Sequence, residues 1–314
     1  LNDPANSVNN VIDINFNVLQ SGFKAIYFWD TASATYKPFN NASDAKYISP
    51  GQGYFVRVSS DGIIKMNENM QNHKSENLFM RGESERFEIK LKVNNGTSEK
   101  NTDIKYINGT TTGLDDGYDA GLFSGSSTSF ALYTHLVAEN DGTKYALQAL
   151  PDSDFNSMIV PVGINAIANS EITFSADILN IPNGLKVYIE DKELNTFTRI
   201  DETNASYKVE LSADLNSGGR FYIHTTTETL SITNDIVKEN IQIFKTGKRI
   251  LTINGLEQGK SKVKVYNTIG KEVFNTNFSN QLSKEIILPK LTSGIYFIQL
   301  ESNSKKINKK IILE

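Results

Sequence analysis

The last eighty or so residues constrain the fold most, because short apolar runs alternate there with turn signals at nearly even spacing. Evenly spaced short strands without helical periodicity are typical of a small all-β sandwich. In KVKVYN, Val263 and Val265 fall on one face and lysines on the other, as in a strand with one buried face. Seven such runs predict a seven-stranded sandwich: IQIF, ILTI, KVKVYN, EVFNTNF, EIIL, GIYFIQL and INKKIIL.

Two turn signals separate the strongest of these runs. The segment 267–270 (NTIG) begins with Asn, which suits the first position of a type I turn, and ends with Gly, which tolerates a left-handed conformation. The segment 291–294 (LTSG) has the same form and precedes the most hydrophobic run. Both segments are therefore predicted to be tight turns between strands.

Three motifs in fixed order at the chain end, VYNTIGKEV, LPKLTSGIYFIQLES and KINKKIILE, resemble the type A C-terminal sorting domain of the type IX secretion system of Bacteroidetes. Many members of that family open with a Pro-Asn-Pro turn, where this chain has the segment 245–248 (KTGK). The resemblance implies that the residues of this chain that match the family's motifs are recognised by the export machinery. These positions are Asn267, Gly270, Lys271, Val273, Leu291, Gly294, Tyr296, Lys309, Lys310 and Ile311.

The same resemblance implies a route and partners. The protein would cross the inner membrane with a signal peptide outside the given sequence, and its sorting domain (241–314) would engage the outer-membrane translocon and its shuttle protein. A sortase-like peptidase would then cut in the Thr-rich linker (227–240) and attach the product to lipopolysaccharide or release it. The expected location is the cell surface or the medium, reached through the periplasm and outer membrane.

Composition narrows the remaining choices. Of 314 residues, 39% are hydrophobic and 22% charged, which is ordinary for a globular protein, and the absence of cysteine excludes disulfides, Cys-based zinc sites and thiol nucleophiles. The net charge of −4 hides a basic C-terminal part, since residues 231–314 carry 14 Lys and Arg against 7 Asp and Glu. These lysines alternate along strands, so we expect a solvated sheet face and no nucleic-acid partner.

Upstream, two further parts are expected. Residues 86–226 contain about nine apolar runs separated by Gly, Asn, Asp and Pro turns, which predicts a β-sandwich of immunoglobulin-like or jelly-roll-like type. Residues 1–85 form a β-rich segment, either the end of a larger upstream domain or packed on the next one. Its recognisable pieces are VIDINFNVLQ, which alternates around Ile12, Ile14 and Phe16 as a strand does, then AIYFWD and ISPGQGYFVRV.

Few residues upstream suggest chemistry. Asp115, Asp116 and Asp119 in GLDDGYDAG offer hard oxygen ligands for calcium, although the spacing does not match an EF-hand. The alternative is a turn whose Asp side chains bond their own backbone. The pair Glu190 and Asp191 does not suit glycoside hydrolysis, because adjacent strand residues point to opposite faces. The three histidines have no metal-ligand spacing, and we expect no cofactor other than calcium.

Two surface features remain open. Aromatic residues at Tyr27, Trp29, Tyr36 and Tyr54 form either a stacking platform for sugars or ordinary core. Thr31, in Asp-Thr-Ala, resembles the acceptor used for O-glycosylation in Bacteroidetes.

The sequence thus predicts an all-β chain of tandem sandwiches that ends in a small immunoglobulin-like domain. We interpret it as a non-enzymatic substrate of type IX secretion whose upstream domains serve as a stalk or adhesin-type module. The alternatives are a carbohydrate-binding or calcium-dependent adhesion module, or the non-catalytic part of a larger secreted hydrolase.

Overall fold

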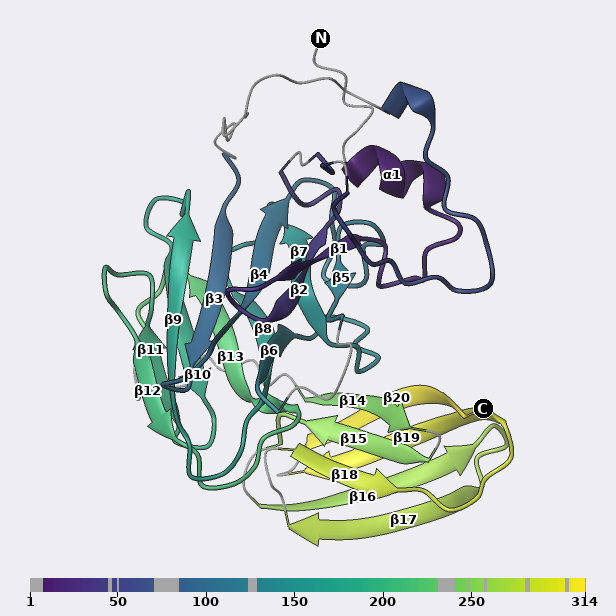
Figure 1. Cartoon of the computed structure of the whole chain (residues 1–314). Helices are drawn as coiled ribbons and strands as arrows, with labels where there is room; N and C mark the ends of the chain where they lie inside the picture. Colours follow the sequence, from purple (N-terminus) through teal and green to yellow (C-terminus); the bar gives the residue numbers. More distant parts are fainter. Residues whose placement is uncertain are drawn as a thin grey trace.

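The computed structural model describes residues 8–44, 47–49, 51–70, 85–123, 129–230, 241–247, 249–256, 259–279, 283–302 and 305–313. It confirms the all-β fold class, with strands grouped into an upstream body and a separate C-terminal sandwich (Figure 1). No helix in these described segments is long and apolar enough to cross a membrane.

One strongly curved sheet of eleven strands forms the upstream body. Its neighbours follow the order β11-β10-β13-β8-β6-β7-β4-β3-β9-β12, with β5 beside β7. The strands are β3 (Glu88–Asn94), β4 (Glu99–Ile107), β5 (Ala120–Gly121), β6 (Ala131–Thr134), β7 (Tyr145–Pro151), β8 (Met158–Asn165), β9 (Glu171–Leu179), β10 (Lys186–Asp191), β11 (Thr196–Arg199), β12 (Tyr207–Glu210) and β13 (Gly218–Thr226).

The curvature closes the sheet around one apolar core. Alternate residues of β3 and β9, such as Leu91 and Phe174, pack in the same cluster as Phe221 of β13. The rings of Phe174 and Phe221 lie 4.8 Å apart, centroid to centroid. Across the two ends of the strand order, the Tyr207 hydroxyl on the last strand, β12, donates to Asp191 on the second strand, β10, at 2.8 Å. The arrangement is a sandwich closed almost into a barrel.

The N-terminal part forms a small unit against this body, made of α1 (Val8–Asn15), the hairpin β1 (Ile26–Asp30) and β2 (Thr35–Phe39), and the 3₁₀ turn η2 (Glu68–Met70). VIDINFNVLQ was predicted as a strand, but its first half lies in helix α1. Val11 and Ile12 pack there against Leu19 and Phe28, while Ile14 is 43% exposed. Packing against the hairpin overrides the β preference of isoleucine and valine.

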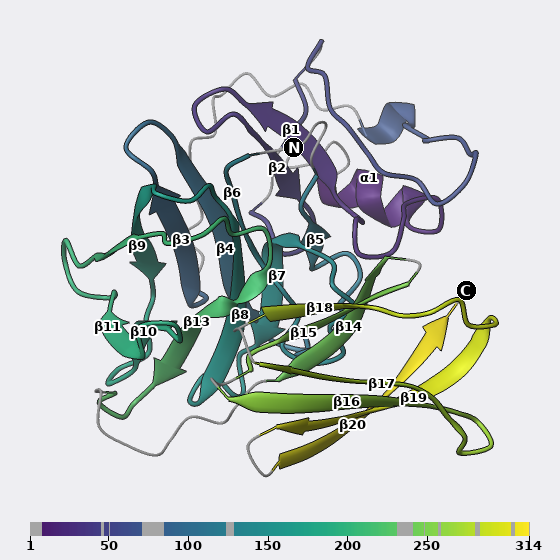
Figure 2. The same ribbon diagram turned by 90° about the horizontal axis from the view of Figure 1, so that it is seen from below.

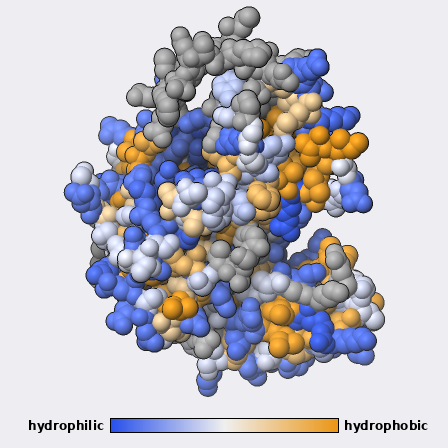
Figure 3. Space-filling view, viewed as in Figure 1, coloured by the Kyte–Doolittle hydropathy of each residue, from blue (hydrophilic) through white to orange (hydrophobic). Residues whose placement is uncertain are grey.

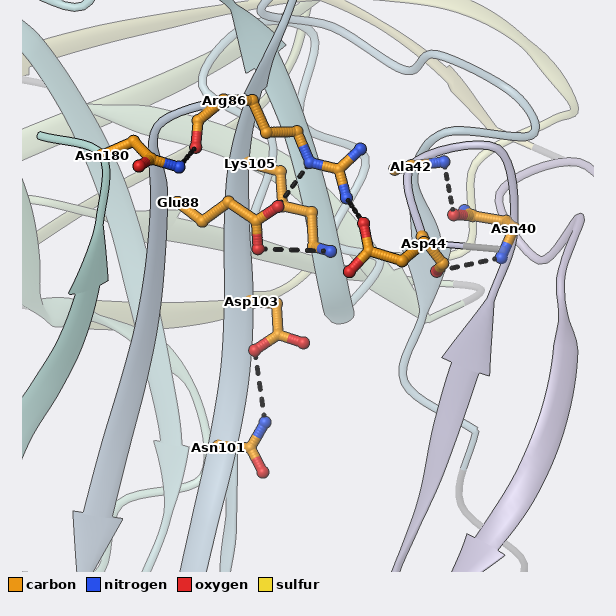
Figure 4. Close-up of polar contacts among 10 residues, drawn as sticks. Asn40, Ala42, Asp44, Arg86, Glu88, Asn101, Asp103, Lys105 and Asn180 are labelled. Carbon is orange, nitrogen blue, oxygen red and sulfur yellow. Dashed lines mark hydrogen bonds and ion pairs between the residues drawn. The ribbon is translucent and has the colours of Figure 1, made fainter. Parts of the chain in front are cut away.

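Polar contacts fix this unit to the curved sheet. The Arg86 guanidinium bridges Asp44 of the N-terminal unit, at 2.9 Å, and Glu88 on β3 (Figure 4). On another side Lys24 pairs with Asp116 at 3.1 Å, and the buried Tyr27 hydroxyl donates to the Gly121 carbonyl at 3.0 Å. The described residues of the N-terminal unit are therefore packed on the sandwich that follows them.

The C-terminal domain is a sandwich of seven strands in two sheets. The three-stranded sheet has the order β14-β15-β18, and the four-stranded sheet the order β17-β16-β19-β20. Leu251, Val263, Ile298 and Ile311 belong to the core between them. The strands are β14 (Gln242–Gly247), β15 (Ile250–Asn254), β16 (Lys260–Asn267), β17 (Glu272–Ser279), β18 (Ser283–Ile287), β19 (Gly294–Ser302) and β20 (Lys305–Leu313).

The C-terminal domain meets the upstream body through its three-stranded sheet, since β13 contacts both β15 and β18. In both ribbon views β16 and β17 lie farther from the upstream body than β14 and β15 do (Figures 1 and 2). The four-stranded sheet therefore turns its outer face away from the rest of the protein.

Candidate functional site

The β16–β17 hairpin carries the first group of predicted recognition residues. Asn267 folds its side chain over the turn, and its Oδ1 accepts the backbone N–H groups of Ile269 and Lys271 at 3.2 and 2.9 Å. Gly270 has a φ of +77°, a left-handed conformation that glycine adopts without a steric penalty. Lys271 is exposed beside the turn. Asn267 and Gly270 thus shape a rigid loop that presents a lysine.

The turn before β19 is fastened by Tyr296. Its ring is 5% exposed in the domain core, and its hydroxyl donates to the Thr292 carbonyl at 2.8 Å. This contact resembles the tyrosine corner of immunoglobulin-like sandwiches. Leu291 and Val273 pack half-buried against the same core, and Gly294 begins the strand.

The last strand, β20, is an edge strand that carries both apolar side chains and lysines. Ile311 is buried in the core, opposite Tyr296 in the β19–β20 register, and Lys310 is exposed opposite Phe297. Lys309 pairs with the fully buried Ile298 and therefore lies on the inward side of the strand, where it is half-buried. A charge on the inward side of an edge strand opposes further strand pairing.

An open groove of about 440 Å³ crosses the outer face of the four-stranded sheet. It runs from the β16–β17 turn across β19 to β20, and Phe297 in its lining is 45% exposed. Lys310 lies directly beside Phe297 in the register. The groove joins an exposed aromatic ring, amide side chains and nearby lysines on one face. Its lining residues are Tyr266, Asn267, Thr268, Gly270, Phe297, Ile298, Gln299 and Asn308.

Two domain families match the chain. The family described as "Secretion system C-terminal sorting domain" matches residues 245–314, the sandwich that carries this groove. The family described as "Domain of unknown function (DUF8693)" matches residues 5–224, more than half of the chain and both upstream parts. The chain belongs to the DUF8693 family. No curated protein matches it at significant similarity.

The sorting-domain match confirms the resemblance drawn from the three terminal motifs. The protein is a substrate of the type IX secretion system of Bacteroidetes, and it is exported to the cell surface or secreted through the outer membrane. Its sorting domain interacts with the type IX machinery.

Eight of the ten predicted recognition residues divide into two groups in the structure; the other two are Gly294, at the start of β19, and the half-buried Lys309 of β20. Val273, Leu291, Tyr296 and Ile311 pack in or against the core, which places their side chains away from a docking partner. Asn267, Gly270, Lys271 and Lys310 lie on or beside the groove face. Their role in recognition stays a prediction. Phe297 and Asn308, which also line the groove, were not singled out from sequence.

In the DUF8693 domain, the three predicted calcium ligands all accept hydrogen bonds from the protein. Asp115 accepts from the Thr111 amide at 2.6 Å, and Asp119 from the amides of Asp115 and Ala149 at 2.6 and 2.7 Å. Asp116 accepts from the Gly22 amide at 2.7 Å and pairs with Lys24. Burial raises the pKa of Asp119 to about 7.

The bonds of Asp115 and Asp119 within the loop fit the alternative of a turn held by its own Asp side chains, whereas Asp116 bonds to the N-terminal unit. Across the described segments, no three His, Cys, Asp or Glu side chains gather in a way that could hold a metal ion. Calcium binding stays a prediction, which a calcium titration of the wild type and of Asp115→Asn would test.

Two of the three histidines are buried, and His73 lies outside the described residues. His224 on β13 lies 2.8 Å from Glu190 on β10, while the neighbouring Asp191 forms a buried ion pair with Arg220 at 2.7 Å. Glu190 and Asp191 thus have separate partners, as expected for adjacent strand residues. Neither buried pair was predicted from the sequence, because β10 and β13 are about thirty residues apart and no pattern indicates that they are neighbours in the sheet.

The aromatic candidates are only partly brought together. Tyr27 is fully buried, but Trp29 is 52% exposed and its ring lies 5.0 Å from that of Tyr36. Phe55, 50% exposed, continues the row 5.1 Å beyond Tyr36. Tyr54 instead points toward Phe28. The result is a short aromatic row on the N-terminal unit, with the half-buried Tyr36 between the exposed Trp29 and Phe55.

Thr31 is exposed in the loop that joins β1 and β2. Its glycosylation stays a prediction. Elsewhere on this unit, apolar surface gathers beside α1 (Figure 3), and the exposed apolar side chains of the unit include Ile14, Ile63 and Met66.

A charged cluster between the N-terminal unit and β3–β4 is the last candidate (Figure 4). Burial raises the pKa of the Glu88 carboxyl, but contacts with Arg86 and Lys105 outweigh it and lower the pKa below its usual value. Burial raises the pKa of Asp103, whose Oδ1 accepts a bond from Asn101 at 3.4 Å. Arg86, Glu88 and Lys105 bond with one another or with Asp44, so the cluster fastens the two parts together.

Proposed function

We propose that the type IX translocon and its shuttle protein bind the outer face of the four-stranded sheet of the sorting domain. The observation that carries this proposal is the groove between the β16–β17 turn and β20, which combines the exposed Phe297 ring with polar side chains and borders Lys310. Exposed aromatic residues surrounded by polar groups are typical of contact surfaces between proteins.

A sortase-like peptidase then cuts in the linker 227–240, most of which lies outside the described residues, and lipopolysaccharide is the acceptor for anchoring. Hydrolysis there leaves the DUF8693 domain outside the cell as the mature product. In this scheme the sorting domain acts as an export signal and has no role in the activity of the mature protein.

Export in the native host tests the recognition face. Deletion of residues 305–314 should abolish export, but it also removes core side chains of β20 such as Ile311. Phe297→Ala is the sharper variant, with Ile287→Ala as its matched control, because Ile287 is 71% exposed on the other sheet. We expect Phe297→Ala to accumulate in the periplasm and Ile287→Ala to be exported normally. Equal export of both variants would contradict the proposal.

For the DUF8693 domain, the proposed role is a non-enzymatic, adhesin-type module at the cell surface. The two described histidines are engaged in packing: His135 through its Nδ1, 2.9 Å from the Thr143 carbonyl, and His224 through Glu190. Assays of the purified protein against polysaccharides and peptides test this assignment, and hydrolysis of either would overturn it.

Glycan binding is the second candidate, favoured by the aromatic row of Trp29, Tyr36 and Phe55. Aromatic rings offer flat apolar faces on which a sugar ring stacks. Binding on a glycan array should be lost with Trp29→Ala and retained with Ile63→Ala, a control that removes a 75% exposed apolar side chain from the same unit. Binding that survives Trp29→Ala would exclude this site.

A further inference from the structure

Part of the outer face of the three-stranded sheet of the sorting domain, on β14 and β15, is buried, although it points away from that domain's core. In the β14–β15 register, Gln242 faces Asn254 and Phe244 faces Thr252. These four side chains are between 1% and 8% exposed, while the core is formed by the alternate residues such as Ile243 and Ile253. A separate sorting domain would place a phenylalanine and three polar side chains in water.

The DUF8693 domain covers this face with the segment between β6 and β7. Asn140 Nδ2 donates to Gln242 Oε1 at 2.5 Å, and Gln242 Nε2 donates to the Leu136 carbonyl at 3.2 Å. The ring of His135 lies 5.8 Å from that of Phe244. Both polar ends of Gln242 are thus satisfied by the upstream domain, as expected for a buried amide.

Two glycines of the DUF8693 domain allow this close approach. A Cβ atom on Gly142 would lie 2.7 Å from the Phe244 ring, and one on Gly218 would lie 2.9 Å from the His135 ring and 3.5 Å from Asn254 Nδ2. A larger residue at Gly142 would press against Phe244 of the sorting domain, whereas one at Gly218 would first meet His135 of its own domain. The two surfaces therefore fit each other in shape around Phe244 and in hydrogen bonding at Gln242.

None of these contacts uses the connecting segment 231–240. We propose that the DUF8693 domain holds its own sorting domain through this face, so that the two stay bound non-covalently when the connector is cut. The occupant of the face is a segment of this same chain, residues 135–142 of the DUF8693 domain. Separation then requires a competing partner or dilution, and it exposes Leu136 and His135 on the mature module. The inference does not depend on which face the export machinery binds.

Among the described residues, one buried polar group in the interface between the two domains is unpaired, which favours their separation. Asn254 Nδ2 has no hydrogen-bond partner within the described segments, although the residue is 1% exposed. A buried polar atom without a partner weakens an interface. Polar contacts between domains of one chain resemble transient protein interfaces. These features of the interface fit a sorting domain that stays bound after cleavage but can still separate.

The test uses the full chain with a protease recognition sequence, flanked by flexible residues, inserted between positions 231 and 240. After complete cleavage, size-exclusion chromatography at micromolar concentration should show one peak that contains both fragments. Two separate peaks from the wild-type protein would overturn the proposal.

Point variants locate the contact. Phe244→Ala should weaken retention of the cleaved sorting domain by roughly tenfold or more, as for buried aromatic residues at interfaces. Phe297→Ala, on the opposite sheet, should leave retention unchanged. Asn140→Ala should also weaken retention of the cleaved sorting domain. Because this substitution lies on the upstream domain, it does not alter the sorting domain and serves as the test if Phe244→Ala disturbs folding. Retention unchanged in both Phe244→Ala and Asn140→Ala would overturn the proposal.

Discussion

The imidazole of His135 and the ring of Phe244 lie 5.8 Å apart, one on the DUF8693 domain and the other on the first strand of the sorting domain. Nδ1 of His135 lies 2.9 Å from the Thr143 carbonyl, and the ring is 2% exposed. A titratable ring therefore lies within the contact between the exported module and its export signal.

Because His135 is buried, we expect the stability of the folded protein to fall in acid. Burial lowers the pKa of His135 to about 4, from an ordinary value of 6.5, with Lys144 adding a smaller decrease against the opposing effects of the Thr143 bond and Asp141. Between these pKa values the unfolded chain binds a proton that the folded chain excludes, so the free energy of unfolding falls as pH falls from about 6.5 toward 4. The full effect is at most about 3 kcal/mol, at roughly 1.4 kcal/mol per pKa unit.

Urea denaturation at pH 7.5, 5.5 and 4.5 measures this effect, with His135→Asn as the non-titrating variant. The difference in unfolding free energy between wild type and variant should shrink as the pH falls. A difference that stays constant across the three pH values would show that His135 does not titrate in this range.

A second prediction concerns the buried ion pair of Arg220 and Asp191, with side chains 6% and 0% exposed. Arg220→Met should lower the free energy of unfolding by about 3 kcal/mol, because it leaves the Asp191 carboxylate buried without its cation. Lys208→Met is the matched control, since its pair with Glu171 is 60% and 59% exposed. Exposed pairs contribute about 1 kcal/mol or less, so similar losses in both variants would argue against a buried charge.

Much of the strand pattern was predictable from sequence. The nine runs predicted between 86 and 226 correspond to β3, β4, β6–β10, β12 and β13. In β3 the alternation of apolar and polar residues indicates one buried face, and β7 and β13 are short apolar runs bounded by turn residues that are buried on both faces. The short strands β5 and β11 gave too few residues for a pattern. Helix α1 was missed because Ile12 and Ile14 also fit a period of two.

The contact between the two domains could not be predicted for a physical reason. In IQIF, Gln242 and Phe244 alternate with buried Ile243, so the pattern assigns them to the outer face of a strand. Whether an outer face meets water or another domain depends on residues more than a hundred positions away. For Trp29 and Tyr36 the sequence left open a stacking platform or ordinary core, and the continuation of the row through Phe55 depends on the bridge between residues 27 and 55.

A third prediction arises from Gln148 on β7, which is fully buried although neither polar atom of its amide has a hydrogen-bond partner within the described segments. Gln148→Met removes both polar atoms at similar volume and should raise the free energy of unfolding by about 1 kcal/mol, since an unpaired buried amide costs 1–3 kcal/mol. Urea denaturation measures it. Destabilisation by Gln148→Met would indicate that bound water satisfies the amide.

The last prediction tests whether Gly270 only shapes the turn or also contacts the export machinery. A Cβ atom there would meet no other atom within 4 Å, so only its φ of +77° opposes a larger residue. Gly270→Ala should cost about 1 kcal/mol through the left-handed backbone, and Gly270→Asn less, because asparagine tolerates this conformation. Gly53→Ala, at an open position without a positive φ, should have little effect.

Export efficiency in the native host then tests what the turn contributes. If Gly270 serves only to shape the loop that carries Lys271, export should follow stability: nearly normal in Gly270→Asn and lower in Gly270→Ala. Equal loss of export in both variants would mean that the export machinery approaches the bare backbone of the turn, because the two side chains differ in conformational cost but both occupy that surface.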